Sequence, residues 1–265
     1  MNGMKRMKLL LVMSIICFQP SWSQDNSQYE KHWFIQNGDT MPYRVLLPPG
    51  YDKAKKYPLV LFLHGRGESG TDNEKQLIHG AALFLRDSIR QKYPAIIVFP
   101  QCSDKSYWSN VQMTTDGAKN SKRTFYFVAG DEPSAAMQLL LGLTDNLFLQ
   151  YHIRRQQVYV MGLSMGGMGT FELVRRKPGL FAAAIPICGG ANPATATKLT
   201  ATNWWVFHGA KDDVVLPSFS EKMVEALRKA KASVKFTLYP SANHNSWDPA
   251  FAEPGLLNWL FLQRK

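Results

Sequence analysis

The stretch from Val158 to Glu172 constrains the fold of this chain more than any other. It opens with a short apolar run, passes through Gly162-Leu-Ser164-Met-Gly166, and continues with further glycines. We interpret it as a buried β-strand, a sharp turn and the first turn of a helix. Glycines flank Ser164 because a side chain would collide with the backbone in so tight a turn. The pattern therefore predicts a serine hydroxyl lifted clear of the edge of a sheet.

The same pentapeptide fits G-x-S-x-G, the pattern of a nucleophile elbow. A chance match is expected in roughly one chain in ten of this length, and its alternative interpretation is a strand-to-helix turn with glycines for close packing. The preceding strand and the following glycines favour Ser164 as a nucleophile. The amide of Met165 would then lie at a helix N-terminus, where an unpaired N–H can bind a developing oxyanion.

Apolar runs alternate with amphipathic segments along the rest of the chain. Two alternating strands flank Asn37-Gly38-Asp39, which predicts a hairpin. Further strands are expected at 57–63, 95–99, 182–187, 204–207 and 234–239, and helices at 73–91, 133–151, 219–231 and 256–263. This alternation predicts an α/β fold with a mostly parallel sheet covered by helices on both faces.

Two residues after the elbow complete a pattern for nucleophilic catalysis. Asp212 and His244 each follow a predicted strand, in the order serine, acid, histidine. We expect His244 to take the proton of Ser164 and to return it to the leaving group, while the acid holds the imidazole in its working tautomer. Taken singly, an aspartate in a turn usually caps it and a loop histidine is usually solvated, so the prediction depends on the three together.

Asp213 is a second candidate for the acid. The spacing Gly209-x-x-Asp212-x-x-Val215-x-Pro217 favours Asp212 and leaves Asp213 in the adjoining turn.

Five motifs together resemble those of the α/β-hydrolase superfamily. They are Leu63-His64-Gly65-Arg66-Gly67-Glu68-Ser69-Gly70, Pro100-Gln101-Cys102, Gly162-Leu-Ser164-Met-Gly166, His208-Gly209-Ala-Lys-Asp212 and His244-Asn-Ser-Trp247. More narrowly, the chain is similar to exported bacterial esterases related to dienelactone hydrolase, prolyl-oligopeptidase-type hydrolases and feruloyl esterases. The resemblance covers nearly the whole chain after residue 23 and implies an α/β-hydrolase fold and a serine hydrolase.

The resemblance also assigns roles within the loop after strand 57–63. In such families the residue after His-Gly supplies the second oxyanion donor from its backbone, which here is Arg66. The side chain of Arg66 differs from the small or apolar side chain common at this position. Whether its guanidinium contacts the substrate is left open. We interpret His64 and His208 as structural. No histidine and carboxylate cluster has ligand spacing, so we expect neither a metal nor another cofactor.

The N-terminal 23 residues have the pattern of a signal peptide. A basic start precedes the apolar run Leu9–Phe18, and small residues precede a cleavage point near Ser23. We therefore expect a protein exported to the bacterial periplasm or medium, without a membrane anchor after cleavage. Residues 24–265 would form one catalytic domain. Cleavage lowers the formal net charge from +11 to +8, and because the lysines are scattered we expect no nucleic-acid partner.

Two cysteines, Cys102 and Cys188, remain after cleavage. In the strand order that the resemblance implies, they follow strands separated by two others, about 14 Å apart at ~4.8 Å per strand. A disulfide needs α-carbons within about 7 Å, so we expect two free thiols.

The connection 103–130 has no periodicity and leaves the same edge of the sheet as the elbow. Connections of this length are usually functional or disordered. Trp108 is a candidate to stack on a substrate, with an aromatic side chain pinning its own loop as the alternative. Trp247, close to His244, is a second candidate. Lys119, Lys122 and Arg123 suggest contact with an acidic group, although a solvated loop is the simpler interpretation.

These features predict a secreted serine carboxylesterase acting on a small-molecule or polysaccharide ester, with acyl or feruloyl esters of plant polysaccharides as the favoured substrates. Two alternatives remain. One is a prolyl-oligopeptidase-type serine peptidase, which uses the same triad. The other is a non-catalytic carbohydrate-binding protein on the same scaffold, which would be expected to lose a triad residue. The acyl group, the alcohol and the oligomeric state are not determined by these features.

Overall fold

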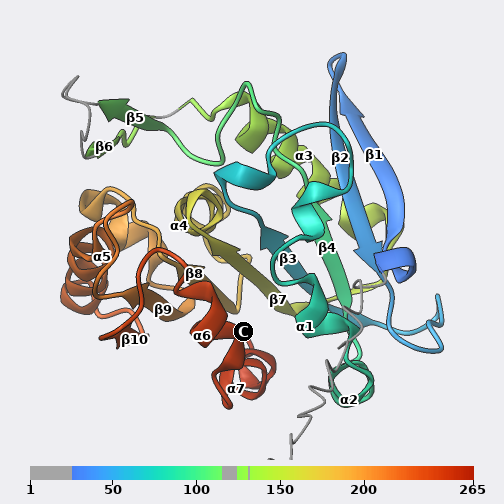
Figure 1. Cartoon of the computed structure of the whole chain (residues 1–265). Helices are drawn as coiled ribbons and strands as arrows, with labels where there is room; N and C mark the ends of the chain where they lie inside the picture. Colours follow the sequence, from blue (N-terminus) through green and yellow to red (C-terminus); the bar gives the residue numbers. More distant parts are fainter. Residues whose placement is uncertain (1–25, 115–123, 131) are drawn as a thin grey trace, which may run out of the picture.

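A central eight-stranded sheet organises the computed structural model, which describes residues 26–114, 124–130 and 132–265 (Figure 1). In spatial order the strands are β1 (Glu30–Gln36), β2 (Asp39–Leu46), β4 (Ile96–Pro100), β3 (Tyr57–Leu63), β7 (Ile153–Leu163), β8 (Ala183–Ile187), β9 (Asn203–Gly209) and β10 (Val234–Tyr239). The pairs β1–β2 and β2–β4 are antiparallel, and every other neighbouring pair is parallel. The predicted α/β-hydrolase fold, with its N-terminal antiparallel hairpin, is confirmed.

The turn of that hairpin follows from two residues. Asn37 and Gly38 both have positive φ, 54° and 86°. A two-residue turn of type I′ requires this conformation at both positions, and asparagine and glycine adopt it most readily. The sequence signal and the backbone therefore agree here.

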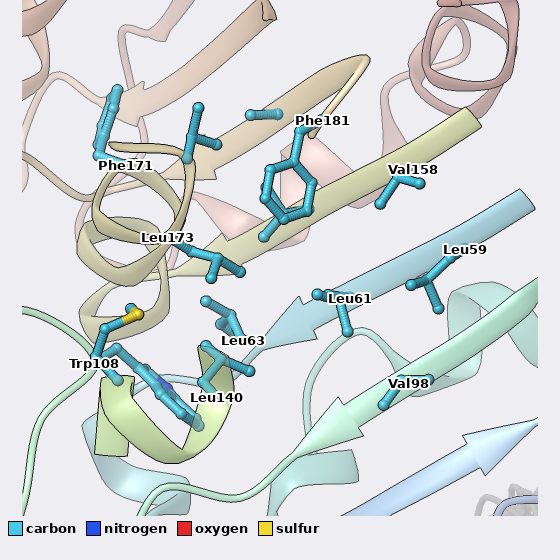
Figure 2. Packing of buried hydrophobic residues seen from close by; sticks show 14 of the residues in the cluster. Leu59, Leu61, Leu63, Val98, Trp108, Leu140, Val158, Phe171, Leu173 and Phe181 are labelled. Carbon is cyan, nitrogen blue, oxygen red and sulfur yellow. The ribbon is translucent and has the colours of Figure 1, made fainter. Parts of the chain in front are cut away.

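Helices cover both faces of the sheet. The helices are α1 (Ala81–Leu85), α2 (Asp87–Lys92), α3 (Ala135–Gln150), α4 (Met165–Arg176), α5 (Pro217–Lys229), α6 (Trp247–Ala252) and α7 (Leu256–Leu262). One hydrophobic cluster joins the sheet to α3, α4 and α5, and a second joins it to α1, α6 and α7. Alternate residues of β3 serve the two faces: Leu61 packs in the first cluster and Phe62 in the second. Figure 2 shows the first cluster between β3, β7 and α4.

The predicted helix over 73–91 was wrong in extent. The segment forms a 3₁₀ turn, η3 (Lys75–Leu77), followed by the short helices α1 and α2. Gly80 has φ 85°, and Arg86 is extended with ψ 124°. Each of these residues leaves the helical region, so the amphipathic pattern is divided among three pieces. Their apolar residues still pack in the second cluster.

The connection 103–130 contains an element that its sequence did not predict. β5 (Val111–Thr114) and β6 (Thr124–Phe127) pair antiparallel as a separate two-stranded sheet. Lys119, Lys122 and Arg123 lie outside the described residues, as do the expected signal peptide and its cleavage point. Shorter 3₁₀ helices are η1 (Asn26–Gln28), η2 (Arg66–Glu68) and η4 (Pro193–Leu199).

The strand order places the two described cysteines far from each other. Cys102 follows β4 and Cys188 follows β8, with β3 and β7 between them. Both thiols are buried and free, as predicted. None of the helices within the described residues combines the length and the apolar character that a bilayer crossing needs.

Candidate active site

Ser164 lies on a strained turn between β7 and α4. Its φ of 53° and ψ of −116° are unusual for a residue with a side chain. Its own N–H donates to the carbonyl of Ile187 at 2.9 Å, which anchors the turn to β8. A β-carbon on Gly162 would collide with the carbonyl of Gly166, and one on Gly166 would collide with the carbonyl of Leu63. The two glycines are therefore required for α4 to approach the end of β3.

The structure brings Ser164, His244 and Asp212 into one hydrogen-bonded chain. His244 Nε2 lies 2.9 Å from Ser164 Oγ, and His244 Nδ1 lies 2.8 Å from Asp212 Oδ2. Because a carboxylate oxygen only accepts, the ring proton is on Nδ1, and Nε2 is free to accept the serine proton. The three residues follow β7, β9 and β10, whose carboxyl ends meet at one edge of the sheet. This is the arrangement that the sequence predicted.

Asp212 is held as an anion by a full set of donors. Its side chain is buried, and Oδ1 accepts from the amides of Val214 and Val215 at 2.9 Å each. Burial alone would raise the pKa of Asp212, but hydrogen bonds from His208 and His244 outweigh it and hold the pKa well below its usual range. Asp213 is exposed, and its backbone N–H donates to Asn243 Oδ1 at 3.2 Å, whereas its carboxyl makes no hydrogen bond to the described residues. The geometry thus favours Asp212 over Asp213 as the partner of His244.

His208 is a second histidine that contacts the Asp212 carboxylate. It is fully buried, and its Nε2 faces Val215 O at 2.8 Å and Asp212 Oδ2 at 3.2 Å. Two acceptors at one nitrogen place the proton on Nε2. Its Nδ1 lies 2.7 Å from Ser220 Oγ. His208 is therefore part of the frame around Asp212, which agrees with the structural role predicted for it.

The loop after β3 lies beside the elbow. Arg66 begins η2 and Met165 begins α4, so neither amide has a partner within its own helix. A β-carbon built on Gly65 would lie 3.6 Å from Ser164 Cβ. The Arg66 guanidinium donates to Ser106 O at 2.9 Å and Asp104 O at 2.5 Å, and so ties this loop to the connection after β4.

Trp108 is not where a substrate could stack on it. Its side chain has no exposed surface and packs in the first hydrophobic cluster (Figure 2). Its Nε1 donates to His64 O at 3.1 Å. The stacking prediction for Trp108 was therefore wrong: the side chain pins its own loop against the core, which was the alternative interpretation.

Trp247 does lie at the cleft. Its ring centroid is 5.5 Å from that of His244, in an edge-to-face arrangement, and it lines the same cavity of about 340 Å³ as Ser164. A larger cavity of about 480 Å³ lies near the amino-terminal ends of β3 and β7, where Tyr57 and Arg154 line it. Ser164 and His244 line the smaller cavity. The hydrogen bonds among Ser164, His244 and Asp212 therefore identify the candidate site, and the cavity volume does not.

One group of atoms could be mistaken for a metal site. Ligand atoms of Cys188, Asp212 and His244 all lie within 4.8 Å of one another. However, Asp212 and His244 are hydrogen-bonded to each other, and burial raises the pKa of the Cys188 thiol well above its usual range. Asp212 and His244 belong to the hydrogen-bonded chain with Ser164, so the group offers no open set of ligands.

Known proteins with similar chains include esterases and peptidases. Residues 36–248 match the family described as "Putative esterase". A thermostable esterase of known structure is 31% identical, with a TM-score of 0.79 over 90% of this chain and 64% of its own. A dipeptidyl-peptidase 5 from Porphyromonas gingivalis is 26% identical over 66% of this chain. The present chain spans only 24% of that peptidase and less than two thirds of the esterase.

A ferulic acid esterase from Anaeromyces mucronatus, solved with ferulic acid, has a TM-score of 0.62 and covers 91% of this chain and 93% of its own. At 17% identity this likeness shows the fold alone. Together, the fold, the elbow serine and the family match over residues 36–248 lead to one conclusion. The chain belongs to this esterase family and has the α/β-hydrolase fold.

Proposed function

We propose that this protein is an exported serine carboxylesterase that acts through an acyl-enzyme on Ser164. The observation that carries the proposal is the unbroken chain from Ser164 Oγ through His244 to the buried carboxyl of Asp212. A non-catalytic binding protein would have no need to keep this geometry or the strained backbone at Ser164.

The steps of ester hydrolysis follow from the position of the His244 proton, which is on Nδ1 and leaves Nε2 free to accept. His244 Nε2 accepts the proton of Ser164 as Oγ attacks the ester carbonyl, and the imidazolium that forms is stabilised by Asp212. The amides of Arg66 and Met165 donate to the carbonyl oxygen as it becomes negative. His244 then protonates the leaving alcohol. In the second half, His244 takes a proton from water as that water attacks the acyl-enzyme, and it returns the proton to Ser164 Oγ as the bond to the acyl group breaks and the acid leaves.

We infer that the natural substrates are acyl or feruloyl esters of plant polysaccharides. Phe125, Met168 and Val214 give the cavity an apolar wall that suits an acyl chain or an aromatic ring. Trp247 offers an aromatic face beside His244. The proposal of export rests on the signal-like residues 1–23. The fold shared with ferulic acid esterases is consistent with this substrate class.

The test is hydrolysis of p-nitrophenyl acetate by the wild-type protein and by Ser164→Ala. We expect turnover by the wild type and a loss on the order of 10⁶ in kcat in the variant, with an unchanged thermal unfolding curve. More than a few per cent of wild-type activity in purified Ser164→Ala would remove Ser164 from the mechanism.

A peptidase activity is the second candidate, favoured by the 26% identity with a dipeptidyl-peptidase. The same experiment separates the two when a dipeptidyl p-nitroanilide is assayed beside the ester. We expect kcat/KM for the ester to exceed that for the amide by several orders of magnitude. A higher value for the amide would favour the peptidase.

A further inference from the structure

A cavity far from the nucleophile is lined by cations. It is the cavity of about 480 Å³ near the amino-terminal ends of β3 and β7. Lys55, Lys56, Lys92 and Arg154 line it, and none of the described residues in its wall is acidic. A neighbouring cavity of about 430 Å³ shares Lys56 and Arg154, adds Arg155, and likewise has no acidic residue among the described residues that line it. The proposed mechanism uses neither cavity.

These cations are scattered along the sequence and come together only in the fold. Lys55 and Lys56 precede β3, Lys92 ends α2, and Arg154 is the second residue of β7. Because β3 and β7 pair in parallel, their amino-terminal ends meet at the same edge of the sheet. A hollow lined by charges of one sign concentrates ligands of the opposite sign. The arrangement therefore favours an anionic ligand at this edge.

The protein supplies little counter-charge of its own to this group. Within the described part of the chain, Lys55 is the only one of the four cations with an acidic partner, and its Nζ lies 3.7 Å from Asp52 Oδ2. Both side chains of that pair are exposed, so water screens their attraction. Lys56, Lys92 and Arg154 form no ion pair with any described residue, and their charges remain available to a ligand.

Arg154 is held in position by neutral acceptors. Its Nη1 donates to Gln157 Oε1 at 2.5 Å, and its Nη2 donates to the carbonyl of Lys56 at 3.1 Å. Gln157 is buried and is itself fixed, since its Nε2 donates to Phe261 O at 3.2 Å. These bonds orient the guanidinium without neutralising it, and they leave further N–H donors for a carboxylate. A group that is already oriented loses less freedom when a ligand binds.

The neutral groups in the wall favour a sugar acid over a nucleic acid. Tyr93 Oη donates to Asn258 Oδ1 at 3.3 Å, and the exposed Asn258 amide has N–H groups without a partner among the described residues, which suit a hydroxyl. Single-stranded nucleic acids stack their bases on exposed aromatic rings. Here Tyr57 and Phe261 are buried, and Tyr93 is stacked on Phe261 with 4.7 Å between the ring centroids. Lys92 Nζ lies 5.2 Å from the centre of the Tyr93 ring. The wall thus offers cations and hydroxyl-binding groups, but no platform for bases.

We propose that the cavity lined by Lys55, Lys56, Lys92 and Arg154 binds the carboxylates of an acidic polysaccharide that carries uronate groups. This site is separate from the nucleophile, because β7 runs for 11 residues between this edge and the elbow, roughly 33 Å at ~3.3 Å per residue. A polymer that reaches both places is held twice, which raises its effective concentration at Ser164. The inference goes beyond the proposed esterase function and does not require it.

The experiment is calorimetric titration of the full chain carrying Ser164→Ala with an unesterified oligogalacturonate and, separately, with a neutral xylan oligomer. We expect binding of the acidic oligomer that weakens as salt is added, and little or no binding of the neutral one. Adding Lys56→Gln and Lys92→Gln together should lower the affinity for oligogalacturonate roughly 10-fold at low salt, and each change alone should lower it by less. Both lysines are exposed, and thermal unfolding checks that the variants are folded.

The matched control changes Lys222 and Lys229 of α5 to glutamine, which removes the same charge from exposed positions outside the cavity. Its affinity should fall by less than about twofold. An equal loss in the control, or equal binding of the neutral oligomer, would overturn the inference. So would the absence of oligogalacturonate binding, including the case in which phosphatidylglycerol vesicles bind in its place and point to a membrane surface. Because the titration uses Ser164→Ala, its result is independent of ester hydrolysis, and the p-nitrophenyl acetate assay tests the esterase function separately.

Discussion

His64 should make the stability of this protein depend on pH. The side chain is buried at the end of β3, and its Nε2 accepts from the amide of Cys102 at 2.9 Å. The ring proton therefore lies on Nδ1, which donates to Gly65 O at 2.6 Å. Burial lowers the pKa of His64 from 6.5 to about 4. The folded protein consequently keeps this imidazole neutral at pH values where the unfolded chain protonates it.

The sign and size of the effect follow from this difference. The contribution of neutral His64 to stability is fully present above pH 6.5 and is lost as pH falls from there towards about 4. One pKa unit corresponds to about 1.4 kcal/mol, so the whole effect is about 3 kcal/mol. Between pH 7 and pH 5 the free energy of unfolding should fall by about 2 kcal/mol through this residue alone.

The assay is urea unfolding at pH 7, 6 and 5 of the wild type and His64→Gln. Glutamine retains an acceptor for the Cys102 amide but does not titrate. We expect the variant to be less stable at pH 7 and to lose about 2 kcal/mol less than the wild type between pH 7 and 5. His152→Gln is the matched control, since it removes an exposed imidazole without opening the core. Parallel pH dependence of the wild type and His64→Gln would refute the reasoning.

Two further predictions concern the acid and the buried tryptophan. Asp212→Asn should lower kcat by ~10⁴, because His244 then loses the anion that holds its tautomer, whereas Asp213→Asn should change kcat by less than about threefold. The reverse order in p-nitrophenyl acetate assays would move the acid to Asp213. Trp108→Ala should lower the free energy of unfolding by about 3–5 kcal/mol, since it leaves a cavity in the core and frees the His64 carbonyl. A loss below 1 kcal/mol in urea unfolding would contradict the packing seen for this side chain.

Much of this fold could be predicted from the sequence, because residues that are neighbours along the chain determine its turns. The Asn37-Gly38 turn needs two residues with positive φ, and the elbow needs glycines where α4 meets β3. Both requirements are met by neighbours along the chain, so they appear as short motifs. The order serine, acid, histidine at strand ends likewise follows from the connectivity of a parallel sheet, whose carboxyl ends share one edge. The pairing of His244 with Asp212 could be predicted for this reason.

Features that depend on contacts between residues far apart in the sequence could not be predicted in this way. An aromatic residue in a loop has the same sequence signature whether it faces the cleft or the core, and only the packing of Trp108 under α4 and β3 decided between them. Glu68 is one residue of a polar loop motif, and nothing in its neighbours shows that Oε2 is buried without a partner beside Ser164. The sequence by itself determined which residues are able to form the hydrogen-bonded chain. The tertiary structure decided which other side chains are enclosed with it, because burial is set by residues far away in the sequence.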